Sequence, residues 1–225
     1  MAGSQRVYKQ RIKSTQSLKK MFRAQELIAA SRIGKARDRT AAAAPYARAI
    51  TRAVSAVATH TTTQHPLTSE RTDTNRVAVL VVASDRGMAG AYSASIIRET
   101  ERLVERLTAE GKEVALYAAG RRAIQYYTFR GRELAGTWSY GSDAPNAEVA
   151  GEIAETLLGA FLAPAAEGGV SELHIVYTQF VNMVTQRPRV VRMLPLEVVE
   201  GVAPAGKHDV LPPVSDTPLT LPSRL

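Results

Sequence analysis

The feature that most constrains this chain is its first stretch, residues 4 to about 57, which has the pattern of one very long helix. At 100° per residue, five apolar side chains fall on one side of that helix: Leu18, Met21, Phe22, Ile28 and Ile33. They form a narrow stripe, interrupted by a glutamine, which is typical of a coiled-coil seam. We therefore expect the helix to pair with another element along this seam.

Basic residues occupy the opposite side of the same helix, namely Lys19, Lys20, Arg23 and Arg37, with Leu27 pointing outward among them. Because proline removes a backbone donor, we expect the helix to bend or restart at Pro45. Roughly forty helical residues span about 60 Å, whereas a globule of this chain length has a radius of gyration of about 17 Å. Much of the helix is therefore expected to protrude.

The net charge of the chain is concentrated on this helix. Residues 1–40 contain eleven Lys and Arg against two acidic residues, which gives +9, and the other 185 residues contain 18 basic and 19 acidic groups, which gives −1. Such asymmetry indicates an acidic partner. Nucleic acid, an anionic membrane surface and an acidic protein cavity all satisfy this requirement.

The composition excludes several other kinds of protein. The chain has no cysteine, so disulfides, thiolate metal sites and cysteine nucleophiles are ruled out. No run of 18 apolar residues is present, and the N-terminus lacks the apolar core of a secretory signal. We expect a cytoplasmic or cytoplasm-facing protein.

The middle of the chain alternates between strand and helix patterns. Strands are expected at residues 76–84, 113–119, 172–180 and 190–199, and helices at 92–110, 121–129 and 147–162. In the last strand, Pro195 would mark an edge or a bulge. Residues 131–141 are expected to be irregular. This order predicts the α/β class: a Rossmann-like, open and mostly parallel sheet with helices on its faces. The predicted divisions are a shaft helix (1–58), a linker (59–75), an α/β body (76–200) and a proline-rich disordered tail (201–225).

The loop after the first strand contains Asp85, Arg86, Gly87 and Gly90. A strand, a glycine turn and a helix N-terminus together can bind a phosphate. This loop, however, matches neither the P-loop nor the dinucleotide-binding fingerprint. We interpret it as a structural turn in which Asp85 and Arg86 tie down the loop.

Nothing else in the sequence forms a catalytic or metal-binding pattern. His174 is expected to be a satisfied residue within a strand, and the remaining histidines and carboxylates lack the spacing of a ligand set. We expect no bound cofactor and a mechanical or scaffolding role.

Three segments resemble the gamma subunit family of F-type ATP synthases. The N-terminal helix of that family resembles residues 20–32 (KMFRAQELIAASR), together with 36–39 and 45–47. The family's loop after the first strand resembles residues 84–90 (SDRGMAG), and its later strand resembles residues 173–180 (LHIVYTQF). The resemblance covers about residues 1 to 200 in the family's order and is closest to actinobacterial members.

This resemblance implies a rotor subunit without a catalytic site of its own. The N-terminal helix would be half of an antiparallel coiled coil that turns inside the alpha–beta head, with the seam toward the second helix and the basic face and Leu27 toward the stator. The body would contact the epsilon subunit and the membrane c-ring. The resemblance places such a protein peripherally on the cytoplasmic face of the bacterial plasma membrane.

The chain departs from the family after Glu200, where a long C-terminal helix is expected and proline-rich sequence follows instead. We therefore expect a truncated form whose seam is unpaired and which does not transmit torque by itself. Two alternatives remain open: a nucleic-acid-binding protein that uses the basic helix, and a nucleotide-dependent enzyme. The seam argues against the first and the missing phosphate fingerprint against the second.

Overall fold

The computed structural model describes residues 2–60, 65–87, 89–141, 145–182 and 184–196. The predicted tail and residues 61–64 of the predicted linker lie outside these residues. In the described part the element order is one long helix followed by strands and helices in alternation.

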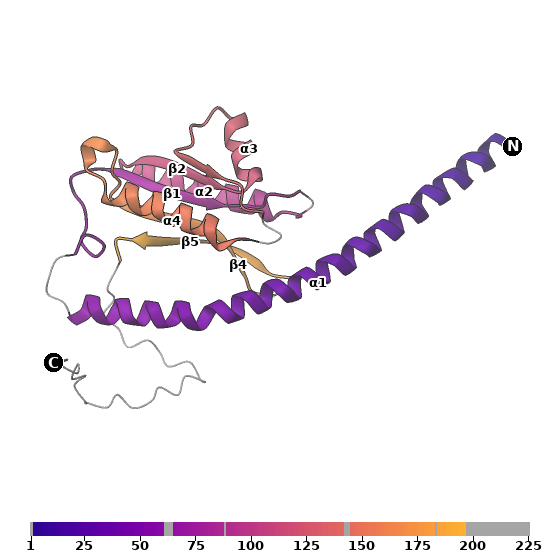
Figure 1. The fold of residues 1–225 in the computed structure, drawn as a ribbon. Helices are drawn as coiled ribbons and strands as arrows, with labels where there is room; N and C mark the ends of the chain where they lie inside the picture. Colours follow the sequence, from indigo (N-terminus) through magenta and orange to yellow (C-terminus); the bar gives the residue numbers. More distant parts are fainter. Residues whose placement is uncertain (1, 61–64, 88, 142–144, 183, 197–225) are drawn as a thin grey trace.

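Helix α1, Ala2–His60, has an N-terminal part that projects beyond the rest of the molecule (Figure 1). Its 59 residues correspond to a length of about 90 Å. It contains Pro45 without a break, so the predicted restart at that residue does not occur. The ribbon curves gently along its length instead (Figure 1). A proline inside a helix removes one hydrogen bond and favours such bending.

Five strands form one sheet in the order β3-β2-β1-β4-β5. Strand β1 (Arg76–Val82) pairs in parallel with β2 (Glu113–Ala119) and β4 (Glu172–Phe180), and β2 pairs in parallel with β3 (Gly136–Trp138). The edge strand β5 (Gln186–Leu194) is antiparallel to β4. The predicted α/β class with an open, mostly parallel sheet is confirmed.

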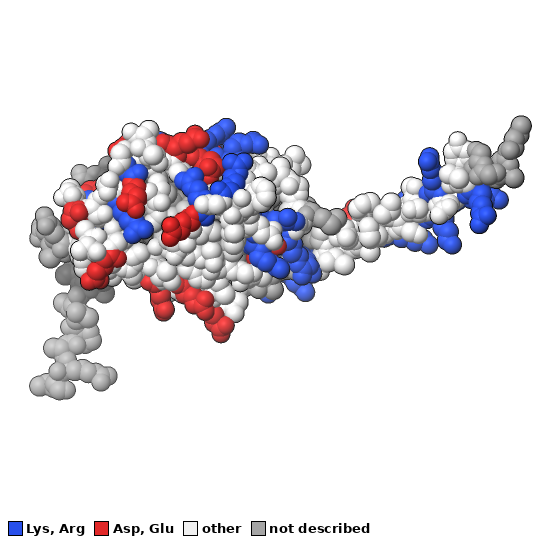
Figure 2. Space-filling view, turned by 90° about the horizontal axis from the view of Figure 1, so that it is seen from above, with Lys and Arg blue, Asp and Glu red and all other residues white. Residues whose placement is uncertain are grey.

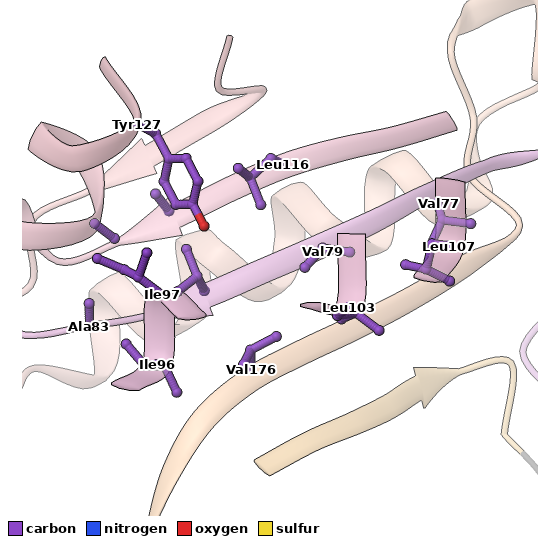
Figure 3. Packing of buried hydrophobic residues seen from close by; sticks show 13 residues of the cluster. Val77, Val79, Ala83, Ile96, Ile97, Leu103, Leu107, Leu116, Tyr127 and Val176 are labelled. Atoms are coloured by element: carbon purple, nitrogen blue, oxygen red, sulfur yellow. The ribbon is translucent and has the colours of Figure 1, made fainter. Parts of the chain in front are cut away.

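Both faces of the sheet are covered, and we call the sheet with its covering helices the body. Helices α2 (Tyr92–Ala109) and α3 (Arg121–Phe129) pack on one face, and α4 (Ala147–Leu162) packs on the other. Figure 3 shows the first of these layers, in which Tyr127, Ile96 and Leu107 meet side chains of the strands. Strand β1 contributes alternate side chains to both layers, which explains its continuous apolar run.

Two predicted elements were wrong. Residues 131–141 are not wholly irregular, because Gly136–Trp138 forms the short edge strand β3, where Trp138 stacks on Tyr117 with 6.1 Å between ring centroids. The last strand occupies Gln186–Leu194, so it begins before the predicted residue 190 and Pro195 follows it. Residues 197–199 of the predicted strand lie outside the described residues. Pro188 lies inside β5, which is possible because an edge strand does not need every backbone donor.

Candidate functional site

The seam of α1 is exposed to solvent in this structure. Leu18, Met21, Phe22 and Ile28 are each 45–55% exposed, although they are the side chains that a core would normally bury. They share one face of the helix because their spacing follows the helical repeat. Burial of the remaining apolar surface of such a side chain stabilises a complex by roughly 1 kcal/mol. A partner that covers the seam would therefore form a complex stabilised by burial of these side chains.

Two side chains of α1 are partly shielded from solvent. Among the described side chains of α1, residues 5–53, Ile33 and Ala44 are half-buried and the others are exposed. They are three helical turns apart and lie on the same side. Ile33 is also the last member of the seam along the chain, so the exposed part of the seam runs from Leu18 to Ile28.

The basic face is exposed along the same part of the helix. Lys19, Lys20 and Arg37 form no ion pair with any described residue. Arg23 differs from them, since its Nη1 donates to Glu26 Oε2 at 2.8 Å within the helix. Leu27, predicted to point outward among these cations, is 60% exposed. Figure 2 shows Lys and Arg side chains along the protruding part of the helix, with very few acidic ones.

Sequence reasoning missed several apolar side chains of α1. The structure shows that the exposed apolar set also includes Val7, Tyr8, Ile12, Tyr46 and Ile50. Extending the helical wheel in both directions would have placed Val7 and Ile50 in line with the seam. The apolar surface available to a partner is therefore longer than predicted.

The predicted loop residues lie at the carboxyl edge of the sheet, where Asp85 is buried and tied to other elements. Its Oδ1 accepts hydrogen bonds from the backbone N–H of Arg121 (2.9 Å) and from Ser139 Oγ (3.1 Å). The carboxylate thus sits at the N-terminus of α3, where the helix dipole stabilises a negative charge. This arrangement supports a structural role for Asp85.

The neighbouring loop residues are also held by local contacts. Ser84 Oγ donates to the carbonyl of Arg86 at 2.8 Å and lies 2.8 Å from Ser93 Oγ. A Cβ on Gly87 would lie 2.1 Å from the guanidinium of Arg122, so that side chain fills the space above the glycine. Gly90 has a φ of 56°. Together these contacts describe a packed turn.

His174 belongs to a charged cluster near the opposite edge of the sheet. Lys112 Nζ donates to Glu172 Oε1 at 2.7 Å, and His174 Nε2 lies 2.8 Å from Glu172 Oε2. Burial lowers the pKa of His174, and this outweighs the neighbouring carboxylate. Burial alone would raise the pKa of Glu172, but the hydrogen bonds from Lys112 and His174 hold it below its usual range. Both oxygens of Glu172 are thus paired, but His174 Nδ1 is buried without a hydrogen-bond partner among the described residues, so the expectation of a fully satisfied histidine is wrong for that atom. The remaining contacts are those of a structural network.

The described residues contain no group of three or more His, Cys, Asp or Glu placed to hold a metal ion. Among the helices that the structure describes, none is sufficiently long and apolar to cross a membrane. The candidate site is therefore the protruding helix, with its seam and its basic face.

Solved structures similar to this chain include two mitochondrial ATP synthases. The Tetrahymena thermophila central stalk and c-ring structure aligns with a TM-score of 0.43 at 18% identity, covering 56% of this chain and 53% of that chain. The Euglena gracilis structure of OSCP, F1 and c-ring aligns with a TM-score of 0.39 at 14% identity, covering 60% of this chain and 40% of the other. The chain thus spans about half of the solved chains that it matches.

Sequence relatives are far closer. The ATP synthase gamma chain of Beutenbergia cavernae is 68% identical over 212 residues, which are 94% of this chain and 71% of that protein. The gamma chain of Pseudarthrobacter chlorophenolicus is 56% identical over the same shares of each chain. A family model described as ATP synthase matches residues 4–218, so the match continues past residue 200, where the sequence resemblance was expected to end. With a family-model match over most of its length and this degree of identity to actinobacterial relatives, the chain belongs to the ATP synthase gamma chain family.

Proposed function

We propose that this chain acts as a central-stalk rotor subunit, in which α1 is the shaft and the body carries it. The single observation that carries the proposal is the exposed apolar seam on a protruding helix of a chain that is 68% identical to an ATP synthase gamma chain. In this role, rotation of a membrane c-ring would turn the body and the shaft. The turning shaft would change the conformation of the nucleotide-binding head.

Each surface of the shaft would have its own partner. The seam would pair with a second helix in an antiparallel coiled coil, because apolar residues at coiled-coil spacing need a facing helix. Lys19, Lys20, Arg23, Arg37 and Leu27 would face the alpha and beta subunits of the stator. The body would contact the epsilon subunit and the c-ring, and it would hold the protein peripherally on the cytoplasmic face of the bacterial plasma membrane.

In this proposal the chain contributes no catalytic residue. The proposed divisions are a shaft (1–58), a linker (59–75), a body (76–200) and a tail (201–225), and Asp85, Arg86, Gly87 and Gly90 serve as a structural turn. The internal contacts of that turn support this assignment. Membership of the gamma chain family argues against the nucleic-acid alternative.

A pull-down with purified alpha and beta subunits tests the proposal. Reversal of two shaft charges, Lys19→Glu with Lys20→Glu, is expected to weaken capture of the head about tenfold, since each exposed ion pair contributes up to about 1 kcal/mol. The matched control is Arg102→Glu, an exposed cation on α2 of the body. Equal capture by the double variant, the control and the parent would contradict the proposal.

A gel shift with DNA addresses the alternative. The rotor proposal expects no DNA complex at salt concentrations where the head is still captured. A DNA complex that forms there, without capture of the head, would favour the nucleic-acid function. Its affinity should then fall steeply with salt, because phosphate contacts release counterions.

A further inference from the structure

A groove runs between α2 and α3 on the side of the body away from α4. It is lined by Ala94, Ile97 and Arg98 of α2 and by Arg122, Tyr126 and Phe129 of α3. Ile97 is buried and forms part of the floor, where it joins the core under the two helices. The groove is open to solvent along its length and has helices on both sides.

Phe129 is the unusual residue of this groove, because its side chain is 92% exposed. It is the last residue of α3, two positions after the fully buried Tyr127. Beside it, Tyr126 is half-buried and lies under the guanidinium of Arg130, 4.7 Å from the ring centroid. An almost fully exposed phenylalanine beside a second aromatic ring is typical of a residue that anchors a binding partner.

The rim of the groove carries positive charge. Arg98 and Arg122 form no ion pair with any residue that the structure describes, whereas the acidic lining residue, Glu101, faces Arg132 at 3.5 Å. Residues 121–132 contain four arginines and no acidic residue. An occupant that leaves these cations unpaired would lose affinity, so charge complementarity calls for carboxylates on both sides of an apolar stripe.

We propose that this groove binds an acidic amphipathic helix of a partner protein. Its apolar stripe would cover Phe129, Tyr126 and Ile97, and its flanking carboxylates would pair with Arg98 and Arg122. A helix fits better than a strand because two helices form the walls and offer no free backbone edge for pairing. This surface is separate from the shaft that carries the proposed rotor function.

A site-specific cross-linking experiment on the full chain tests the proposal. The probe is a synthetic 18-residue helical peptide with a leucine stripe flanked by glutamates. Because the chain has no cysteine, one photo-cross-linker can be attached at Gln125→Cys in the groove or, as a control, at Glu148→Cys on α4. The peptide is expected to label the groove position and not the control. Equal labelling at both positions would overturn the proposal.

Variants separate the groove from the basic shaft, which could also attract an acidic peptide. Arg98→Glu with Arg122→Glu is expected to weaken labelling at position 125 about tenfold, and a lysine-flanked version of the peptide should restore it. Phe129→Ala should weaken it by a similar factor through loss of the apolar anchor. Arg98 and Phe129 are exposed, and Arg122 is exposed apart from its contact above Gly87, so unfolding midpoints should stay close to that of the parent.

The matched control is Lys19→Glu with Lys20→Glu on the shaft, which should leave the labelling at position 125 unchanged. If the shaft variant abolishes labelling and the groove variants do not, the groove is not the binding site. Capture of the alpha–beta head by the Phe129→Ala variant should equal that of the parent. A failure of the rotor proposal would therefore be distinguishable from a failure of the groove proposal.

Discussion

The protruding helix and the body place the same kinds of side chain in opposite environments. Phe161 of α4 is 1% exposed within an apolar cluster, whereas Phe22 of α1 is 55% exposed. Arg71, in the segment between α1 and β1, is mostly buried and hydrogen-bonded to the body, whereas Arg37 of α1 has no ion pair with any described residue. The body is thus stabilised by its own contacts, while α1 has surfaces whose stabilisation depends on a partner.

This difference indicates how the two regions respond to mutation. In the body, loss of a side chain leaves a cavity or an unpaired polar group, and the free energy of unfolding falls. On α1, loss of a side chain changes little within the chain and much in a complex. The four predictions below test this contrast in order of decreasing expected effect.

The largest effect is expected at the phenylalanine pair. Phe161→Ala should lower the free energy of unfolding of the body by about 3–5 kcal/mol, because it opens a cavity between α4 and the sheet. Phe22→Ala should change it by less than about 0.5 kcal/mol, since its ring is already solvated. Chemical denaturation monitored by Trp138 fluorescence measures both. A comparable loss from the two variants would show that α1 is packed in solution.

The arginine pair should show a smaller contrast. Arg71 Nη1 donates to the carbonyls of Ala163 (2.9 Å) and Val170 (3.3 Å) and also to that of Phe161, so it satisfies the C-terminal end of α4. Arg71→Met should cost about 2–3 kcal/mol, as expected for charge-assisted hydrogen bonds to buried acceptors. Arg37→Met should be neutral within about 0.5 kcal/mol in the same denaturation assay. A neutral Arg71→Met variant would contradict the assigned role of these hydrogen bonds.

A pH effect is expected in the body through His174. Its pKa in the folded protein lies below the usual 6.5 because of burial, so the unfolded chain binds the proton more readily. The associated stability is complete above about pH 6.5 and is lost as the pH falls through the folded-state pKa. Between pH 7.5 and 5.5 the free energy of unfolding should fall by up to about 1 kcal/mol.

His174→Gln is the control for this pH effect, since glutamine can still donate to Glu172 but does not titrate. The variant should lose most of the change between pH 7.5 and 5.5, while a parent-like pH dependence would assign the effect to another group. The cations Lys112 and Arg192 lie near His174 in both proteins and stay charged throughout this range.

The smallest effect is expected on α1 itself. Arg23 and Glu26 form an ion pair whose side chains are 69% and 66% exposed. Glu26→Gln should therefore lower helicity at 222 nm only slightly, corresponding to at most about 0.5 kcal/mol, and the difference should vanish at 1 M salt. A large, salt-independent loss would mean that this part of α1 has contacts beyond its own helix.

Much of the fold follows from local patterns in the sequence. The bounds of β2, β4 and α4 agree with the predicted ranges, because a short run of apolar residues and a helical apolar stripe can each be recognised within one segment. Strand β3 has three residues and depends on pairing with β2 and on the stacking of Trp138 over Tyr117. Such pairing joins distant segments, and no local periodicity encodes it.

In the candidate site, too, some features follow from local sequence patterns and others depend on the fold. The seam and the basic face follow from a helical wheel, since both are properties of one helix. The partial burial of Ile33 and Ala44 does not follow from it, because solvent exposure depends on the three-dimensional surroundings of each side chain. The placement of Asp85 against α3 likewise required the strand order, which brings residues 36 positions apart to one hydrogen bond.

The segment that leads from α1 into the sheet has a mechanical consequence. The carbonyl of Leu67 accepts a hydrogen bond from Leu196 N at 2.7 Å. Arg71 donates hydrogen bonds at the C-terminal end of α4, and Thr74 Oγ1 donates one to the carbonyl of Gly169 at 3.2 Å. A force that pulls or twists α1 is therefore shared among the hydrogen bonds of these three residues before it reaches β1. In a rotating assembly, the sheet would be spared the strain that its first strand would otherwise receive directly.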